Sequence, residues 1–250
     1  MSPLLHTAAF AACGIDAVYV ACEVTDVRAA VAGLDALGAL GANVTVPHKR
    51  AVWELVERRT DEANHIGAAN TLFRDGRSWV ADNTDALGLH RVLSDDVGLT
   101  AGEGVVLYGA GGAARAAAVA LGRLGASVRV EARRPERAVQ VQRLAIETGA
   151  RALMPAARPQ LIINATPLGL HGEQLPEQFR VLSADQRALD LVYGTEPTPF
   201  VRDARAAGAR AWDGLGMLVA QAGASFERWT RVAAPLPAMW EAARSTASSR

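Results

Sequence analysis

The feature that most constrains the fold is a glycine-rich loop between a buried strand and a helix. Residues 104–108 form an apolar run, and the loop Gly109-Ala110-Gly111-Gly112-Ala113 follows it directly. A long alanine-rich segment comes next, and a second run with strand character covers residues 127–131. Strand, glycine loop, helix and strand in this order predict a β-α-β unit with parallel strands, as in a doubly wound sheet.

A glycine loop in this context predicts a binding site for the phosphates of a dinucleotide. Gly111 and Gly112 carry no side chain, so a pyrophosphate can approach the backbone, and the N-terminus of the helix favours an anion. Ala114, in place of a third glycine, still allows close packing of the helix. The alternative is a tight turn without a ligand, but the flanking strand and helix favour the ligand.

The charged residues after the second strand bear on the choice of cofactor. Glu131 is suited to the ribose hydroxyls of NAD, whereas Arg133, Arg134 and Arg137 are suited to the 2′-phosphate of NADP. Three arginines against one glutamate favour NADP. A solvated charged turn is the alternative.

Helices and strands alternate along the rest of the chain, which predicts an α/β protein. Helices are expected at 2–13 (with Ser2 as the N-cap), 25–37, from Pro47 onward, and at 84–93, 135–148, 198–207, 215–230 and 237–244. Strands are expected at 17–23, 43–45, 161–164 and 189–193, with a hairpin of 71–74 and 78–81 around Asp75-Gly76. A polar connection at residues 94–104 separates two regions of different composition.

Lys49 is the only lysine, against 25 arginines. A surface charge at this position could have been arginine, as it is everywhere else in the chain. Lysine differs because it can exchange a proton, whereas arginine cannot be deprotonated in a protein. The sole lysine is therefore a candidate for proton chemistry, and a solvated lysine left by chance is the alternative.

Asparagine is also scarce, and four of its five occurrences stand in short strings that contain threonine. Such amides and hydroxyls satisfy turns, and they also bind polyhydroxylated ligands by directional hydrogen bonds. Asp85, in one of these strings, is expected to pair with Lys49 or to cap the following helix. The strings are Asn43-Val44-Thr45, Asn70-Thr71, Asn83-Thr84-Asp85 and Asn164-Ala165-Thr166-Pro167.

Overall composition excludes several classes of function. The formal net charge is zero, which argues against nucleic acid or an acidic membrane surface as a partner. Every apolar run is interrupted by charged residues before it could span a bilayer, and we expect no signal peptide at the start of the chain. Cys13 and Cys22 lack metal-ligand spacing, so we expect two buried thiols in a reducing cytoplasm and no metal site.

These strings together resemble the shikimate dehydrogenase family, which includes the quinate/shikimate dehydrogenases, over nearly the whole chain. The resemblance implies that Lys49 and Asp85 are catalytic. It implies that the substrate is bound by Ser2, Thr45, Asn70, Tyr193 and Gln221. It implies that the cofactor is bound by residues 109–113, Arg133, Arg134, Arg137, Asn164, Thr166, Leu191 and Gly214. Gly214 and Gln221 belong to one string, Gly214-Leu215-Gly216-Met217-Leu218-Val219-Ala220-Gln221.

The resemblance further implies reversible, NADPH-dependent reduction of 3-dehydroshikimate to shikimate by a cytoplasmic monomer or homodimer. Residues 1–85 with 214–250 would bind substrate, and 86–213 would form a Rossmann-type NADP domain. The family pattern normally has a further strand and serine before the segment that begins at Ser2, so we expect the first sheet to lack a strand. Ala132 stands where the family's phosphate-binding string has asparagine. The alternatives are a paralogue that uses NAD and quinate or another cyclic hydroxy acid, and a non-catalytic nucleotide-binding protein.

Overall fold

The computed structural model of the protein describes residues 1–245, which divide into two compact units. The first contains Met1–Leu87 and the described residues from Val219 onward, and the second contains Gly88–Leu218. Helices α5 (Thr84–Arg91) and α10 (Leu215–Thr230) carry residues of both units. Residues 246–250, which the sequence assigns to the substrate domain, lie outside the described part of the chain.

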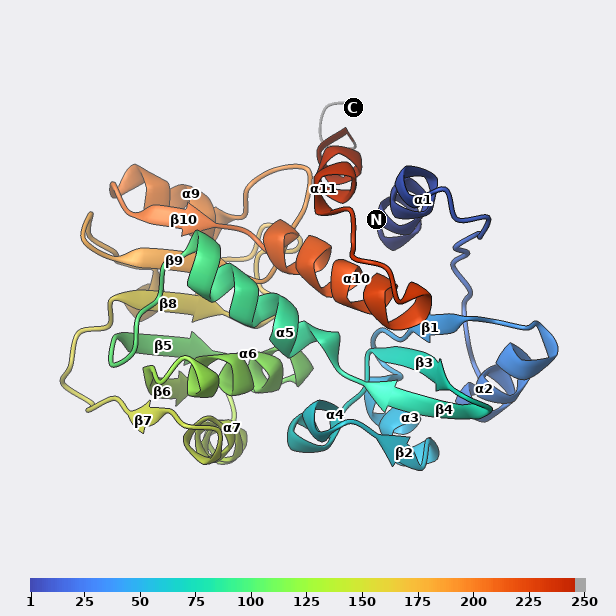
Figure 1. The fold of residues 1–250 in the computed structure, drawn as a ribbon. Helices are drawn as coiled ribbons and strands as arrows, with labels where there is room; N and C mark the ends of the chain where they lie inside the picture. Colours follow the sequence, from blue (N-terminus) through green and yellow to red (C-terminus); the bar gives the residue numbers. More distant parts are fainter. Residues whose placement is uncertain (246–250) are drawn as a thin grey trace. The chain divides into compact units, whose positions relative to one another are not determined.

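The second unit is built on a fully parallel six-stranded sheet (Figure 1). Its strands are β5 (Gly104–Tyr108), β6 (Ser127–Glu131), β7 (Arg151–Ala152), β8 (Leu161–Asn164), β9 (Arg187–Asp190) and β10 (Arg210–Trp212). The spatial order is β10-β9-β8-β5-β6-β7. This is the Rossmann order, with its switch point between β5 and β8, so the predicted doubly wound sheet is confirmed.

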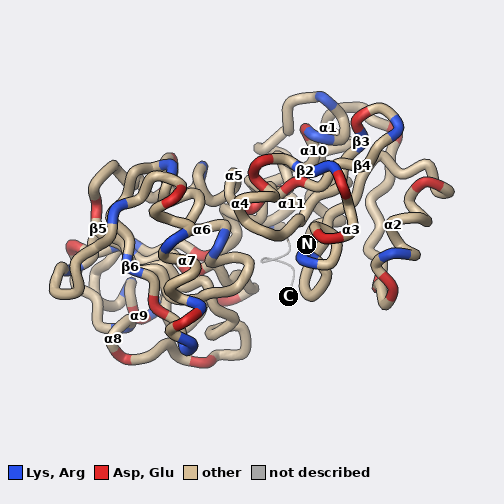
Figure 2. The backbone as a smooth tube through the Cα atoms, turned by 90° about the horizontal axis from the view of Figure 1, so that it is seen from below, with Lys and Arg blue, Asp and Glu red and all other residues tan. Residues whose placement is uncertain are grey.

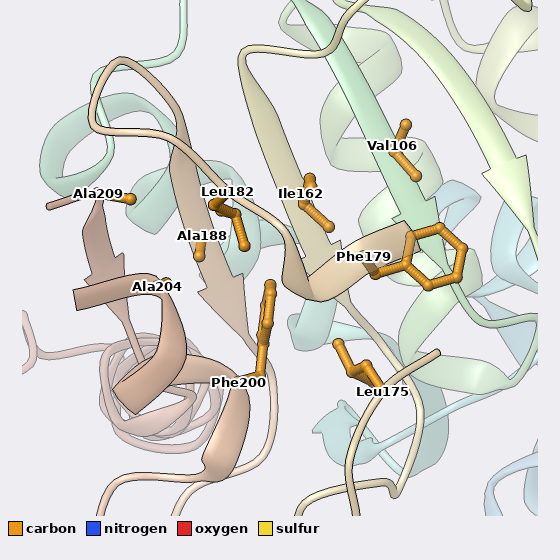
Figure 3. Packing of buried hydrophobic residues seen from close by; sticks show 9 residues of the cluster. All are labelled: Val106, Ile162, Leu175, Phe179, Leu182, Ala188, Phe200, Ala204 and Ala209. Carbon is orange, nitrogen blue, oxygen red and sulfur yellow. The ribbon is translucent and has the colours of Figure 1, made fainter. Parts of the chain in front are cut away.

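Helices cover this sheet because its central strands, β5, β8 and β9, are buried along most of their length. α6 (Gly112–Arg123) connects β5 to β6, α7 (Pro135–Glu147) connects β6 to β7, and the two helices pack together. α8 (Glu177–Arg180) and α9 (Pro199–Ala206) contribute Phe179 and Phe200 to a cluster on Val106 and Ile162 (Figure 3). This cluster therefore covers one face of β5 and β8 at the point where Val106 pairs with Ile162.

The first unit has a mixed four-stranded sheet in the order β1-β3-β4-β2. The strands are β1 (Gly41–Asn43), β2 (Arg58–Arg59), β3 (Thr71–Asp75) and β4 (Ser78–Asp82). β3 and β4 form the predicted hairpin, and β2 adds parallel to β4. The helices are α1 (Ser2–Cys13), α2 (Val27–Ala36), α3 (Lys49–Leu55), α4 (Asp61–Ile66) and α11 (Leu236–Ser245).

The predicted strand at residues 17–23 is wrong. These residues run without a ladder partner within the described structure, and Val18 and Val20 are 86% and 68% exposed. The segment has the β-branched composition of a strand, but a strand also needs a neighbour for its backbone hydrogen bonds. Tyr19 attaches the segment instead, through its stacked contact with His6 and its hydrogen bond to Asn43.

Smaller differences concern the ends of elements. Ser2 lies inside α1, with Met1 as the N-cap, and Gly14 ends this helix in the left-handed region. The strand expected at 43–45 ends at Asn43, and the strand expected at 189–193 is β9, which ends at Asp190. The helix from Thr84 continues as a π-helical turn, Val92–Asp96.

Charged residues of both signs are interspersed along both units (Figure 2). Such a mixture agrees with the zero net charge. Among the described residues, every helix is too short or too polar to cross a membrane.

Candidate active site

Lys49 and Asp85 form an ion pair in the first unit. Lys49 is the first residue of α3 and Asp85 is the second residue of α5. The lysine Nζ lies 2.7 Å from the aspartate Oδ2, and the two side chains are 24% and 8% exposed. The sole lysine is thus brought to the carboxylate that the sequence paired with it, with a partly open ammonium group.

Asn70 fixes the other oxygen of this carboxylate. Its Nδ2 donates to Asp85 Oδ1 at 2.8 Å and to Thr84 Oγ1 at 3.0 Å, while its Oδ1 accepts from the Thr84 amide at 2.8 Å. Gln221 Oε1, on α10, lies 3.5 Å from the same Nδ2. Four of the predicted catalytic and substrate-binding residues therefore converge: Lys49, Asp85, Asn70 and Gln221.

A buried cluster of hydroxyl groups, from Thr71, Thr84 and Ser225, lies next to Asn70 and stabilises its position. Ser225 Oγ lies 2.8 Å from Thr71 Oγ1 and 3.2 Å from Thr84 Oγ1, and it accepts from Asn43 Nδ2 at 2.9 Å. The cluster joins β1, β3, α5 and α10, so it fixes four elements of the site against one another. Ser225 is not among the predicted site residues, although its spacing of four residues from Gln221, on the same helix face, could have indicated it.

Ser2 and Thr45 are placed less directly. Burial raises the pKa of Tyr19 to about 12, and a hydrogen bond with Ser2 offsets part of this effect. Tyr19 Oη in turn donates to Asn43 Oδ1 at 3.0 Å, which links Ser2 to the hydroxyl cluster. Thr45 is exposed, four residues before Lys49, and its carbonyl accepts from the His48 amide at 2.9 Å.

The glycine loop of the second unit fits a phosphate group. Gly109 has φ +135°, and a Cβ there would lie 2.6 Å from the Ala165 carbonyl oxygen, so the fold itself requires glycine. Cβ atoms on Gly111 and Gly112 would meet no atom within 4 Å. Neither of these two glycines is required by φ or by packing within the chain, whereas a phosphate at the N-terminus of α6 would use the open space.

Glu131 is already occupied by an ion pair. Arg129 Nε lies 3.0 Å from Glu131 Oε1, two residues apart on β6, and Arg129 Nη1 also donates to the carbonyls of Met154 and Pro155. The predicted cofactor residues Arg133, Arg134 and Arg137 are all exposed just after the strand. The carboxylate suited to NAD is thus neutralised within the protein, and the arginines suited to a 2′-phosphate lie open to solvent.

Asn164 and Thr166 form one hydrogen-bonded turn at the end of β8. Asn164 is fully buried, and its Oδ1 accepts from the Thr166 amide at 3.0 Å and from Thr166 Oγ1 at 2.7 Å. Its Nδ2 donates to Asp190 Oδ1 and to the Leu168 carbonyl. The Asn164 side chain thus shapes the loop, and a cofactor contact would involve Thr166 or the backbone.

Leu191, Tyr193 and Gly214 complete the predicted set. A Cβ on Gly214 would lie 2.3 Å from the Leu191 carbonyl oxygen, so packing within the unit explains this glycine. Tyr193 is 38% exposed, and burial of its ring raises its pKa. The cofactor and substrate roles of these three residues stay predictions.

One cavity lies away from these residues. It has a volume of about 470 Å³ and lies over the face of β5, β6 and β8 on which Phe179 packs. Arg129, Glu131 and Arg158 line it, and it contains none of the predicted catalytic residues. The predicted catalytic residues converge instead at the Lys49–Asp85 ion pair.

Comparisons with known proteins agree with the sequence resemblance. Residues 1–72 match the model of the shikimate dehydrogenase substrate binding domain, and residues 214–244 match that of the shikimate 5′-dehydrogenase C-terminal domain. A shikimate dehydrogenase (NADP(+)) of Anaeromyxobacter sp. (strain Fw109-5) is 46% identical, over 94% of this chain and 88% of the relative.

Two solved structures are similar along nearly the whole chain. A shikimate dehydrogenase in complex with NADP+ has a TM-score of 0.89 at 30% identity, covering 98% of this chain and 90% of the other. The Thermus thermophilus enzyme, in complex with NADP(H) and shikimate, has a TM-score of 0.85 at 34% identity, covering 98% and 94%.

Proposed function

This chain belongs to the shikimate dehydrogenase family, and from that premise we propose that it catalyses the reversible, NADPH-dependent reduction of 3-dehydroshikimate to shikimate. It is an oxidoreductase that acts on a CH–OH group and uses NADP. The observation that carries the proposal is the Lys49–Asp85 ion pair, with Asn70 on the second carboxylate oxygen.

The pair supplies the proton chemistry of this reaction. When bound, NADPH supplies a hydride to the carbonyl carbon of the substrate. Lys49 Nζ then donates a proton to the alkoxide oxygen that develops at that carbonyl. Asp85 orients the ammonium group through Oδ2, and it accepts a hydrogen bond from a neighbouring substrate hydroxyl. In the oxidative direction Lys49 takes the proton back.

The remaining residues of the first unit bind the polyhydroxylated substrate. Asn70 and Gln221 lie beside the carboxylate of Asp85 and offer amide groups to ring hydroxyls. Ser2 and Thr45 of the first unit and Tyr193 of the second complete the proposed substrate set. We therefore assign substrate binding chiefly to the first unit.

The second unit binds the cofactor in this proposal. The loop 109–113 holds the pyrophosphate, Arg133, Arg134 and Arg137 hold the 2′-phosphate, and Thr166, Leu191 and Gly214 lie on the nicotinamide side.

The NAD-dependent quinate alternative depended on Glu131, and the Arg129–Glu131 pair removes that support. We also propose that the protein is a cytoplasmic monomer or homodimer. Two free cysteines support the cytoplasmic location, and the zero net charge supports the absence of a nucleic-acid partner.

The test is substitution of Lys49. Lys49→Ala should lower kcat by about a hundred- to ten-thousand-fold, the usual range for an acid-base group, while the Kd for shikimate changes far less. Lys49→Arg should lower kcat to a similar extent, because arginine keeps the charge but cannot exchange the proton. The matched control is Arg50→Ala, an exposed cation of the same helix that pairs with Glu54. Wild-type turnover in Lys49→Ala would refute the proposed role.

A further inference from the structure

Asp190 is a buried carboxylate at the end of β9 with no ion-pair partner among the residues that the structure describes. It is fully buried, whereas aspartate is almost never fully buried unless its charge is compensated. Burial raises the pKa of this carboxyl, and hydrogen bonds from Thr198, Val192 and Asn164 oppose that effect. A group this costly to bury calls for a function beyond filling the core.

Neutral donors from two loops converge on the Asp190 carboxylate. Asn164 Nδ2 donates to Oδ1 at 2.8 Å and the Val192 amide donates to the same oxygen at 3.0 Å. Thr198 Oγ1 donates to Oδ2 at 2.6 Å. Strands β8 and β9 lie side by side in parallel (Figure 1), so this one carboxylate joins the loop after β8 to the loop after β9.

The Asp190 carboxylate and the Leu168 carbonyl together determine the orientation of the Asn164 amide, because both accept from its Nδ2. An ionised carboxylate only accepts hydrogen bonds, so the Nδ2 of Asn164 must face it. The Oδ1 of Asn164 then faces the Thr166 amide and hydroxyl, at 3.0 and 2.7 Å. If the amide turned over, its NH₂ group would oppose the Thr166 amide. Asp190 therefore sets the conformation of residues 164–168 through Asn164.

The loop after β8 lies at the topological switch point of the sheet, between β8 and β5. In open parallel sheets a nucleotide binds at the carboxyl ends of the strands at this point. We propose that Asp190 is a positioning residue for the cofactor, because it holds the loop after β8, with Thr166, in the conformation that receives NADP(H). The inference rests on the proposed function, and it extends that function to a residue outside the predicted site.

The test compares binding of NADPH with binding of shikimate. Asp190→Asn keeps the shape but replaces one accepting oxygen with an NH₂ donor, so the hydrogen bonds from Asn164, Val192 and Thr198 cannot all keep their present directions. The Kd for NADPH, followed by nucleotide fluorescence without substrate, should therefore rise about tenfold or more. The KM for shikimate should stay within about twofold. A general loss of structure would instead affect both ligands and the midpoint of thermal unfolding.

A second pair of variants applies if Asp190→Asn folds poorly. Thr198→Val removes the hydroxyl that donates to Oδ2, and Thr198→Ser retains it. The valine variant should weaken NADPH binding and the serine variant should restore it. The matched control is Asp185→Asn, an exposed carboxylate in the same unit, which should change neither constant.

Wild-type protein is measured first, so that the two proposals fail separately. If the wild type neither binds NADPH nor oxidises shikimate, the proposed function fails. If the wild type does both, and Asp190→Asn and Thr198→Val bind NADPH as tightly as it does, the positioning role of Asp190 is overturned.

Discussion

Replacement of Gly111 by aspartate should separate cofactor binding from folding. Gly111 is the N-cap of α6, with φ −87° and ψ −169°, which any residue adopts. A Cβ there meets no atom within 4 Å. Aspartate is a better N-cap than glycine by a few tenths of a kcal/mol, and its charge near the helix N-terminus adds about 0.3–1 kcal/mol. Gly111→Asp should therefore fold at least as stably as the wild type.

The same carboxylate should oppose the cofactor. It occupies the amides at the start of α6 that a pyrophosphate would use, and it places like charges together. Two unit charges 4 Å apart repel by about 4 kcal/mol at an effective dielectric constant of 20, and solvent reduces this at an exposed residue. We expect NADP to bind about ten- to a thousandfold more weakly. Gly111→Asn has the same shape and the same N-cap but no charge, so its affinity for NADP should fall less.

Two measurements decide this prediction. Thermal unfolding of the ligand-free variants should give midpoints equal to the wild type or a few degrees higher. Titration with NADPH should rank the affinities as wild type, then asparagine, then aspartate. Gly109→Ala is the contrasting variant: with φ +135° and the Ala165 carbonyl in the way, it should lose about 1–3 kcal/mol of stability. If Gly111→Asp binds NADPH as tightly as the wild type, the loop is not the phosphate site.

Two further predictions concern the first unit. Burial lowers the pKa of His6 to about 4, from 6.5, and Asn43 offsets part of this shift. The unfolded chain therefore binds more protons between these values, and stability should fall by about 3 kcal/mol as the pH drops from 6.5 to 4. Urea unfolding should show this loss in the wild type and a smaller one in His6→Phe; equal losses would exclude His6 as the cause. Ser225→Ala leaves Asn43 Nδ2 and two threonine hydroxyls without a shared partner and should cost about 1–3 kcal/mol in the same assay. A loss below about 0.5 kcal/mol would show that the hydroxyl cluster relaxes.

Much of the second unit could be predicted from the sequence because its signals are local. The apolar run before Gly109 and the glycines after it define strand, loop and helix within one stretch, and parallel pairing follows from the connection. The pair of Lys49 and Asp85 could be proposed because each residue stands out in composition or in a short string. The structure brings them to 2.7 Å.

What the sequence could not supply depends on neighbours distant in the chain. Residues 17–23 have strand composition, but whether a strand forms depends on a partner for its backbone. Ser225 looks like any serine in a helix until β1, β3 and α5 surround it. The Arg129–Glu131 pair is different, because the two residues are two apart on β6 and the alternation of a strand could have predicted their contact.

The most direct test of the account is absorbance at the reduced-nicotinamide band, with purified protein and shikimate, and with NADP or NAD in parallel reactions. We predict rapid reduction of NADP and much slower reduction of NAD. Lys49→Ala should lose both reactions. Equal or faster reduction of NAD would contradict the assignment of the arginines after β6. No reduction of either nucleotide, by protein that still binds NADPH, would contradict the catalytic role of the Lys49–Asp85 pair.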